Sequence, residues 1–259
     1  MIGLPPAARG FAPGPHWGRR PQTPFHLIRV LHRLGVQALD SRRAALMQAA
    51  ARRLGSRGQS PLALFFALVM LPCAALADDT PKTPIDALNA GLSNAEKTGS
   101  QPFQDRYNAL APIVDRTFDL PQILKTIVGL RWSQIPPDQQ TKLLAVFRAF
   151  TISSYVAVFK TDSGDAFQTL PDERNVGADV VVESQIVPKQ GDDPTRIDYV
   201  MRRGPNGWQA VDVLQLGTIS QAAVQRSDFR GPLNDGGAPK LIESLQAKVD
   251  TLSGNTIKP

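Results

Sequence analysis

The sequence predicts an α+β domain in which helices pack on one face of a curved antiparallel sheet. Two patterns indicate this arrangement. Apolar residues recur every three or four positions between residues 84 and 164, which is helical spacing, and then alternate with polar residues between 167 and 214, which is strand spacing. Helical spacing returns after residue 219. Helices that cover a curved sheet in this way can leave an apolar cavity between the two layers.

The first 77 residues differ in composition from the rest of the chain. They carry ten arginines, no lysine and one acid, whereas the later residues carry 19 basic and 22 acidic side chains. The net charge of +6 therefore belongs to the leader, and we expect no nucleic-acid partner. All three histidines and the one cysteine also precede residue 78. Without them the remaining chain lacks the commonest general base, the soft metal ligands and the thiol nucleophile, so we expect no enzyme, no metal and no cofactor.

Residues 47–77 are typical of a signal peptide. Arginines precede an apolar run at 62–71, and the small residues Ala75 and Ala77 follow it. We expect cleavage after Ala77 and export to the periplasm. An uncleaved anchor is the alternative, but the run is shorter than the roughly 20 residues that span a bilayer.

Two further alternatives concern this leader. A lipoprotein would be acylated at Cys73, although Pro72 directly before it is unfavourable. Residues 1–46 are rich in proline, glycine and arginine, and we interpret them as a non-native or misassigned extension ahead of a start at Met47. A functional extension is the other interpretation. Residues 78–259 are then a single domain, large enough to fold without disulfides.

Four helices are expected before the sheet. The first begins near Pro84, and the second covers about 103–117. Asp119 is a capping residue for the third, which Gly129 ends. The fourth begins at 136–138, has a wide apolar face and is expected to end near Gly164.

Alternation predicts antiparallel strands over 180–186, 196–202 and 208–214. Turn residues at 191–194 and 204–207 join them in sequence order, so the sheet is expected to be a meander. A helix is expected over 219–229, and a last amphipathic helix follows the glycine pair at 236–237.

An ordered series of residues between 103 and 229 resembles a known family. Its first block is Phe118, Asp119, Gly129, Trp132, Gln140, Phe147, Phe150 and Tyr155, and its second block is 207–213 with 217–220, Arg226 and Phe229. Together these residues resemble the MlaC-like periplasmic phospholipid-binding family, also called the toluene-tolerance family. The stretch 225–229 and the glycine pair at 236–237 are similar to its hopanoid-associated branch, HpnM.

The resemblance implies a cone-like, NTF2-like fold that encloses an apolar lipid pocket, with lipid head groups near its mouth. It also implies a shuttle that carries a phospholipid or hopanoid-type lipid between an inner-membrane transporter complex of the ABC type and an outer-membrane partner. We expect a monomer. One long acyl chain needs a deep apolar site to leave a membrane, because each buried methylene contributes about 0.8 kcal/mol.

Large apolar side chains on the fourth helix and on the strands are the candidates for the pocket wall. They are Phe147, Phe150, Tyr155, Phe159, Val180, Val182, Ile197, Tyr199, Met201 and Trp208. Ordinary core packing is the alternative for each of them. Asp212 lies on the same strand face as Trp208 and is expected to cap a helix or hold a loop.

Two other functions stay open. One is a periplasmic adaptor that binds no lipid. The other is an isomerase or dehydratase that uses Asp198, Asp212 or Tyr199, against which stands the lack of a nucleophile motif or paired carboxylates.

Three arginines are the candidates for binding phosphate. Arg202, Arg203 and Arg226 would meet lipid head groups or an acidic partner, unless they are ordinary solvated surface charges.

Overall fold

A computed structural model describes residues 79–259, and the expected leader, its cleavage site and residues 1–46 lie outside this range. The helices are α2 (Thr83–Lys97), α3 (Phe103–Thr117), α4 (Leu120–Val128), η1 (Gly129–Gln134), α5 (Pro137–Val158) and α6 (Gln221–Ser253). The strands are β1 (Ala166–Val176), β2 (Asp179–Val187), β3 (Thr195–Gly204), β4 (Gly207–Gln215) and β5 (Ile219–Ser220). The α+β prediction is confirmed.

The five strands form one antiparallel sheet in the order β1-β2-β3-β4-β5, so the expected meander is confirmed. Gly204 pairs with Gly207 across the tight turn between β3 and β4, and Gly207 takes the positive φ that this turn requires. The pairing shifts register within β1 and again between β3 and β4. Such bulges bend a sheet and increase its twist, which curves it around the helices.

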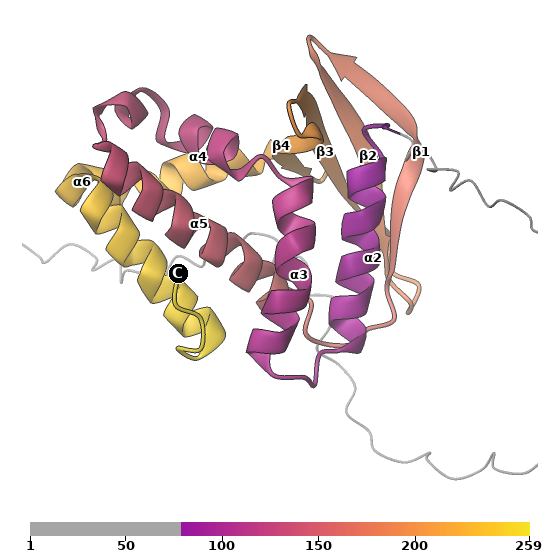
Figure 1. Ribbon diagram of the computed structural model, residues 1–259. Helices are drawn as coiled ribbons and strands as arrows, with labels where there is room; N and C mark the ends of the chain where they lie inside the picture. Colours follow the sequence, from indigo (N-terminus) through magenta and orange to yellow (C-terminus); the bar gives the residue numbers. More distant parts are fainter. Residues whose placement is uncertain (1–78) are drawn as a thin grey trace, which may run out of the picture.

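The helices gather on one side of the sheet, as Figure 1 shows. α2 packs on β1 and on α3, whereas α5 lies between α3, α4 and α6. Phe118, which ends α3, bridges to Ala210 of β4 and so places α4 beside the sheet. α5 is, among residues 79–259, the one helix long and apolar enough to cross a membrane, but the surrounding helices bury most of it.

Three ends of two helices test the predicted boundaries. The Asp119 carboxylate accepts a hydrogen bond from the backbone N–H of Gln122 at 3.0 Å, which confirms the cap of α4. Gly129 follows that helix with φ +68°. The predicted end of α5 near Gly164 is wrong, because the helix stops at Val158. Arg106 of α3 binds carbonyls of its last turn, so no glycine is needed there.

The C-terminal helix also differs from the prediction. Ile219 and Ser220 pair with β4 as a short strand instead of beginning a helix, and α6 starts at Gln221 with the Ser220 hydroxyl as its cap. The helix then continues beyond Phe229 as far as Gly236 and Gly237, whose backbone angles break it. The glycine pair therefore correctly predicted where the first part of α6 ends and the last amphipathic helix begins.

Candidate functional site

A narrow cavity lies between α2, the C-terminal turn of α5 and the sheet. Its volume is about 480 Å³ including the open mouth, of which only about 30 Å³ can hold the centre of a water molecule. It is lined by Asn89, Leu92, Tyr155, Phe159, Phe167, Ser184, Gln185, Ile186, Ile197, Tyr199, Val213, Gln215 and Gln221. None of these thirteen side chains carries a charge at neutral pH, so the wall suits an uncharged, largely apolar guest.

Aromatic rings form one continuous wall of this cavity. Tyr155 stacks on Phe159 with 6.2 Å between ring centroids, and Phe159 meets the edge of Phe167 at 5.4 Å. Phe118 extends the row, because its ring lies 5.9 Å from Tyr155 and 6.3 Å from Tyr199. The row joins α5 to β1 and β3, so the cavity is built at the junction of the two layers.

The two tyrosine hydroxyls stay neutral. Burial raises the pKa of Tyr155 well above its usual value, and the neighbouring Tyr199 raises it further. Burial likewise raises the pKa of Tyr199. Each hydroxyl therefore keeps its proton and remains a hydrogen-bond donor at any physiological pH.

Four of the ten candidate pocket residues line the cavity: Tyr155, Phe159, Ile197 and Tyr199. Two more, Val182 and Met201, are fully buried on the same sheet face but nearer the opposite strand ends. Val180, which pairs with Met201, and Trp208 are only partly buried there.

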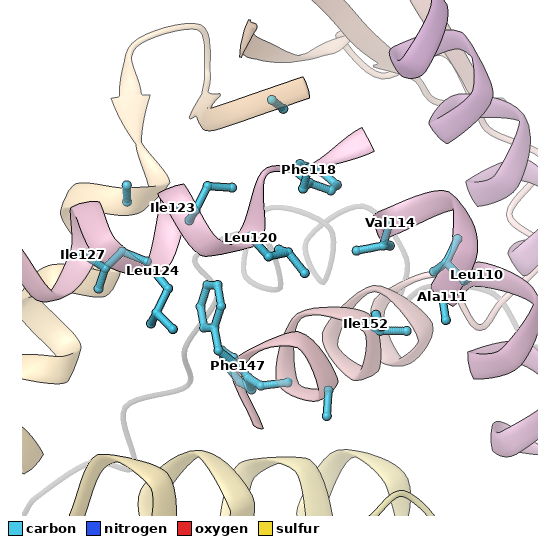
Figure 2. Close-up of a cluster of buried hydrophobic side chains, with 14 of the residues drawn as sticks. Leu110, Ala111, Val114, Phe118, Leu120, Ile123, Leu124, Ile127, Phe147 and Ile152 are labelled. Carbon is cyan, nitrogen blue, oxygen red and sulfur yellow. The ribbon is translucent and has the colours of Figure 1, made fainter. Parts of the chain in front are cut away.

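The other two candidates lie in the helical layer. Phe147 meets Phe229 of α6 edge-on at 6.3 Å, and Lys248 of the same helix lies 5.7 Å from the centre of the Phe150 ring. Figure 2 shows Phe147 pointing toward α4, beside Leu120 and Leu124. Phe147 and Phe150 are thus packed between helices and do not line the cavity.

The sequence interpretation missed several wall residues. Asn89 and Leu92 lie on the buried stripe of α2, Phe167 begins β1, and Gln215 and Gln221 flank β5. Asn89 carried a usable signal, since a polar residue on a largely apolar helix stripe needs a polar partner. Its amide donates to the Thr169 hydroxyl at 3.0 Å.

The carboxylates considered for catalysis have structural partners away from the cavity. Asp198 points to the opposite sheet face from Tyr199, where it is fully buried and accepts hydrogen bonds from Arg196 at 2.9 Å and Arg174 at 3.3 Å. Asp212 accepts from the backbone N–H of Ala222 at 3.0 Å, which confirms its predicted role at a helix start. Of the three residues named, Tyr199 alone lines the cavity.

The chain matches the family model described as MlaC protein over residues 82–247. The chain belongs to the MlaC family. No curated protein gave a significant match. Among solved structures, a phospholipid-binding protein from Ralstonia solanacearum, in complex with a phospholipid, has a similar fold: the TM-score is 0.57 and the identity 23%, covering 68% of this chain and 98% of that chain.

The family match includes every residue that lines the cavity. The resemblance to MlaC proteins is therefore confirmed at the level of the family and of the α+β fold. Its narrower form, membership of the hopanoid-associated branch, stays a prediction.

The three arginines considered for phosphate are engaged within this MlaC protein. Arg202 forms a two-point ion pair with Asp179, at 2.7 and 2.6 Å, and Arg203 pairs with Asp79. Arg226 of α6 donates to the carbonyl of Thr126 in α4 at 2.6 Å. A phosphate would have to compete with these partners.

A buried acid lies next to the cavity. Glu96, near the end of α2, is 6% exposed and accepts a hydrogen bond from the Ser163 hydroxyl at 3.2 Å. Burial raises the pKa of Glu96 to about 7, the Ser163 bond opposes this rise, and Asp165 and Asp162 add to it. The neutral form is thus favoured in the folded state.

We expect the stability of the protein to fall between about pH 4.5 and pH 7 because of Glu96. The unfolded chain releases this proton near 4.5, but the folded protein holds it up to about pH 7, so ionisation favours unfolding. The loss is on the order of 3 kcal/mol. Urea unfolding at pH 5 and pH 8 measures this loss. The free energy of unfolding of Glu96→Gln should rise relative to that of the wild type as pH rises. Glu243→Gln, on an exposed carboxylate, is the control, and equal pH profiles for Glu96→Gln and wild type would contradict the assignment.

Proposed function

We propose that this MlaC-family protein is a periplasmic carrier that binds a phospholipid or hopanoid-type lipid in the cavity. The observation that carries the proposal is the largely aromatic and aliphatic wall, to which residues 79–259 contribute no charged side chain. The similar Ralstonia protein supports it, since it was solved with a phospholipid bound. The protein would act by stoichiometric transfer between an inner-membrane transporter complex and an outer-membrane partner.

Size and energetics indicate how such a lipid is held. Burying an acyl chain contributes about 0.8 kcal/mol per methylene, so a dozen methylenes supply on the order of 10 kcal/mol. The centre of a water molecule can reach only about 30 Å³ of the cavity, whereas the full hollow, including its open mouth, is about 480 Å³. Binding therefore requires the wall side chains to separate. A chain that leaves a bilayer was already buried there, so the roughly 10 kcal/mol is the cost of exposure to water that burial in the cavity avoids.

The rest of the proposal concerns the whole chain. Residues 47–77 would direct export, and cleavage after Ala77 would release the single domain as a monomer in the periplasm. The hopanoid-associated branch rests on the residues at 225–229 and 236–237.

Native mass spectrometry of the mature domain, purified from periplasm without detergent, tests this function. We expect one lipid per protein, identified after organic extraction. Val213→Trp should lower the bound lipid at least about tenfold, because the partly buried Val213 lines the cavity and an indole would fill it. Leu252→Trp places the same ring on α6, away from the cavity, and should keep the lipid.

The outcomes separate the carrier from its alternatives. Wild-type protein that is empty after purification and takes up no lipid from vesicles would refute the carrier and favour an adaptor. If a folded Val213→Trp variant bound the normal amount of lipid, the lipid site would have to lie elsewhere on the protein.

A further inference from the structure

An unpaired hydrogen-bond donor lies in the wall of the cavity. Gln215 ends β4 and Gln221 begins α6, and both line the cavity while being only 7% and 8% exposed. The Gln215 amide donates to Oε1 of Gln221 at 2.6 Å. Within residues 79–259, the Nε2 group of Gln221 has no hydrogen-bond partner. A buried donor without an acceptor is unfavourable and therefore uncommon, which makes this amide a candidate for contact with a ligand.

The backbone around Gln221 is held in place from several sides. Leu214 and Gln215 pair with Ser220 and Ile219, so β5 is fixed to β4. The Asp212 carboxylate accepts from the N–H of Ala222 at 3.0 Å, and the Ser220 hydroxyl accepts from that of Ala223 at 3.1 Å. The backbone of Gln221 is thus fixed and its Oε1 is held by Gln215, so the donor is positioned before any ligand arrives.

The surroundings decide which acceptor this donor suits. No cationic side chain from the described part of the chain lines the cavity, so a phosphate would enter without a countercharge, which is costly in an apolar site. Phosphates also favour arginine and lysine over a neutral amide. An uncharged carbonyl fits better. In a lipid whose acyl chain fills the cavity, the ester carbonyl is the acceptor that directly adjoins the chain.

We propose that Nε2 of Gln221 donates a hydrogen bond to an acyl ester carbonyl, so that the cavity recognises the ester linkage of its lipid and is insensitive to the charge of the head group. This inference rests on the proposed lipid-binding function. It predicts that diester lipids are preferred over ether lipids of the same chain length. Tyr155 and Tyr199 also line the cavity, and both are retained in the Gln221 variants, so a loss of the preference is assigned to Gln221.

The test is a competition between two phosphatidylcholines, one diacyl and one dialkyl, mixed equally in vesicles and offered to the mature domain. Bound lipid is quantified by mass spectrometry. We expect the wild type to favour the diester by about three- to tenfold, and Gln221→Leu to bring the ratio close to one. Gln221→Met, which keeps the side-chain length, is the second variant should the first not fold.

Gln246→Leu is the matched control. Gln246 lies on α6 away from the cavity, and its amide donates to Oδ1 of Asp250 at 3.0 Å, so its loss should leave the diester preference unchanged. The same competition between diacyl phosphatidylcholine and diacyl phosphatidylglycerol should give a ratio near one.

The outcomes distinguish this inference from the function on which it rests. Equal binding of diester and ether lipids by the wild type would overturn it while leaving the carrier intact, and so would a preference that survives in folded Gln221 variants. A strong preference for the anionic phosphatidylglycerol would also overturn it, in favour of phosphate recognition. Binding of no lipid of any kind would refute the proposed function itself.

Discussion

Replacing Phe147 with alanine is expected to lower the free energy of unfolding by about 3 to 5 kcal/mol and to leave lipid binding by the folded protein unchanged. The ring is 1% exposed and lies between α4, α5 and α6, where it meets Phe229 edge-on. Neighbouring helices hold their positions, so the truncation leaves a void that costs more than the lost transfer energy alone. The cavity on the sheet side would keep its walls.

Urea unfolding measures the first expectation, and native mass spectrometry at a temperature where the variant is folded measures the second. Phe159→Ala is the informative comparison, because Phe159 is nearly as buried, at 3% exposed, but lines the cavity. It should lose both stability and lipid. Loss of lipid from folded Phe147→Ala would instead show that the binding site extends into the helical layer.

This contrast shows what helical spacing in a sequence can and cannot predict. The pattern correctly indicated that Phe147 and Phe150 of α5 are buried, as is Phe159 directly after the helix, and that Tyr155 packs against this core. It did not indicate what buries them. Phe147 and Tyr155 are eight residues apart, about 12 Å along the axis, so one face of the helix passes from α6 to the sheet. Which element covers each part of α5 depends on the tertiary arrangement, so the local spacing of apolar residues cannot predict it.

The strands show the same limit of a sequence pattern. Alternation placed Val180, Val182, Ile197 and Tyr199 on the face that carries the helices, and turn residues gave the strand order correctly. Alternation is the same along a whole strand, however, so it cannot tell at which end a cavity lies. The cavity is at the Ile197 end.

A buried cation holds the end of α5 beside the cavity, and no pattern in the sequence predicted it. Arg106 of α3 is 5% exposed, and its Nη2 donates to the carbonyls of Val156 at 2.9 Å and Phe159 at 2.6 Å, with a longer bond to Ala95 in α2 at 3.4 Å. These carbonyls belong to helix ends, where the negative end of the helix dipole attracts a cation. Burial lowers the pKa of Arg106. The usual pKa of arginine is so high that the side chain still stays charged at neutral pH.

We expect Arg106→Met to destabilise the protein by about 3 kcal/mol, because methionine fills the space but leaves the carbonyls of Val156 and Phe159 without a donor. For a domain of this size that corresponds to a melting temperature lower by roughly 6 to 12 °C. Amide exchange should accelerate most in the last turn of α5, and lipid loading should fall as well, since Phe159 lines the cavity. Arg106→Lys keeps the charge and one carbonyl contact, so it should lose about half as much stability. A methionine variant as stable as the wild type would mean that burying the guanidinium costs as much as its hydrogen bonds return.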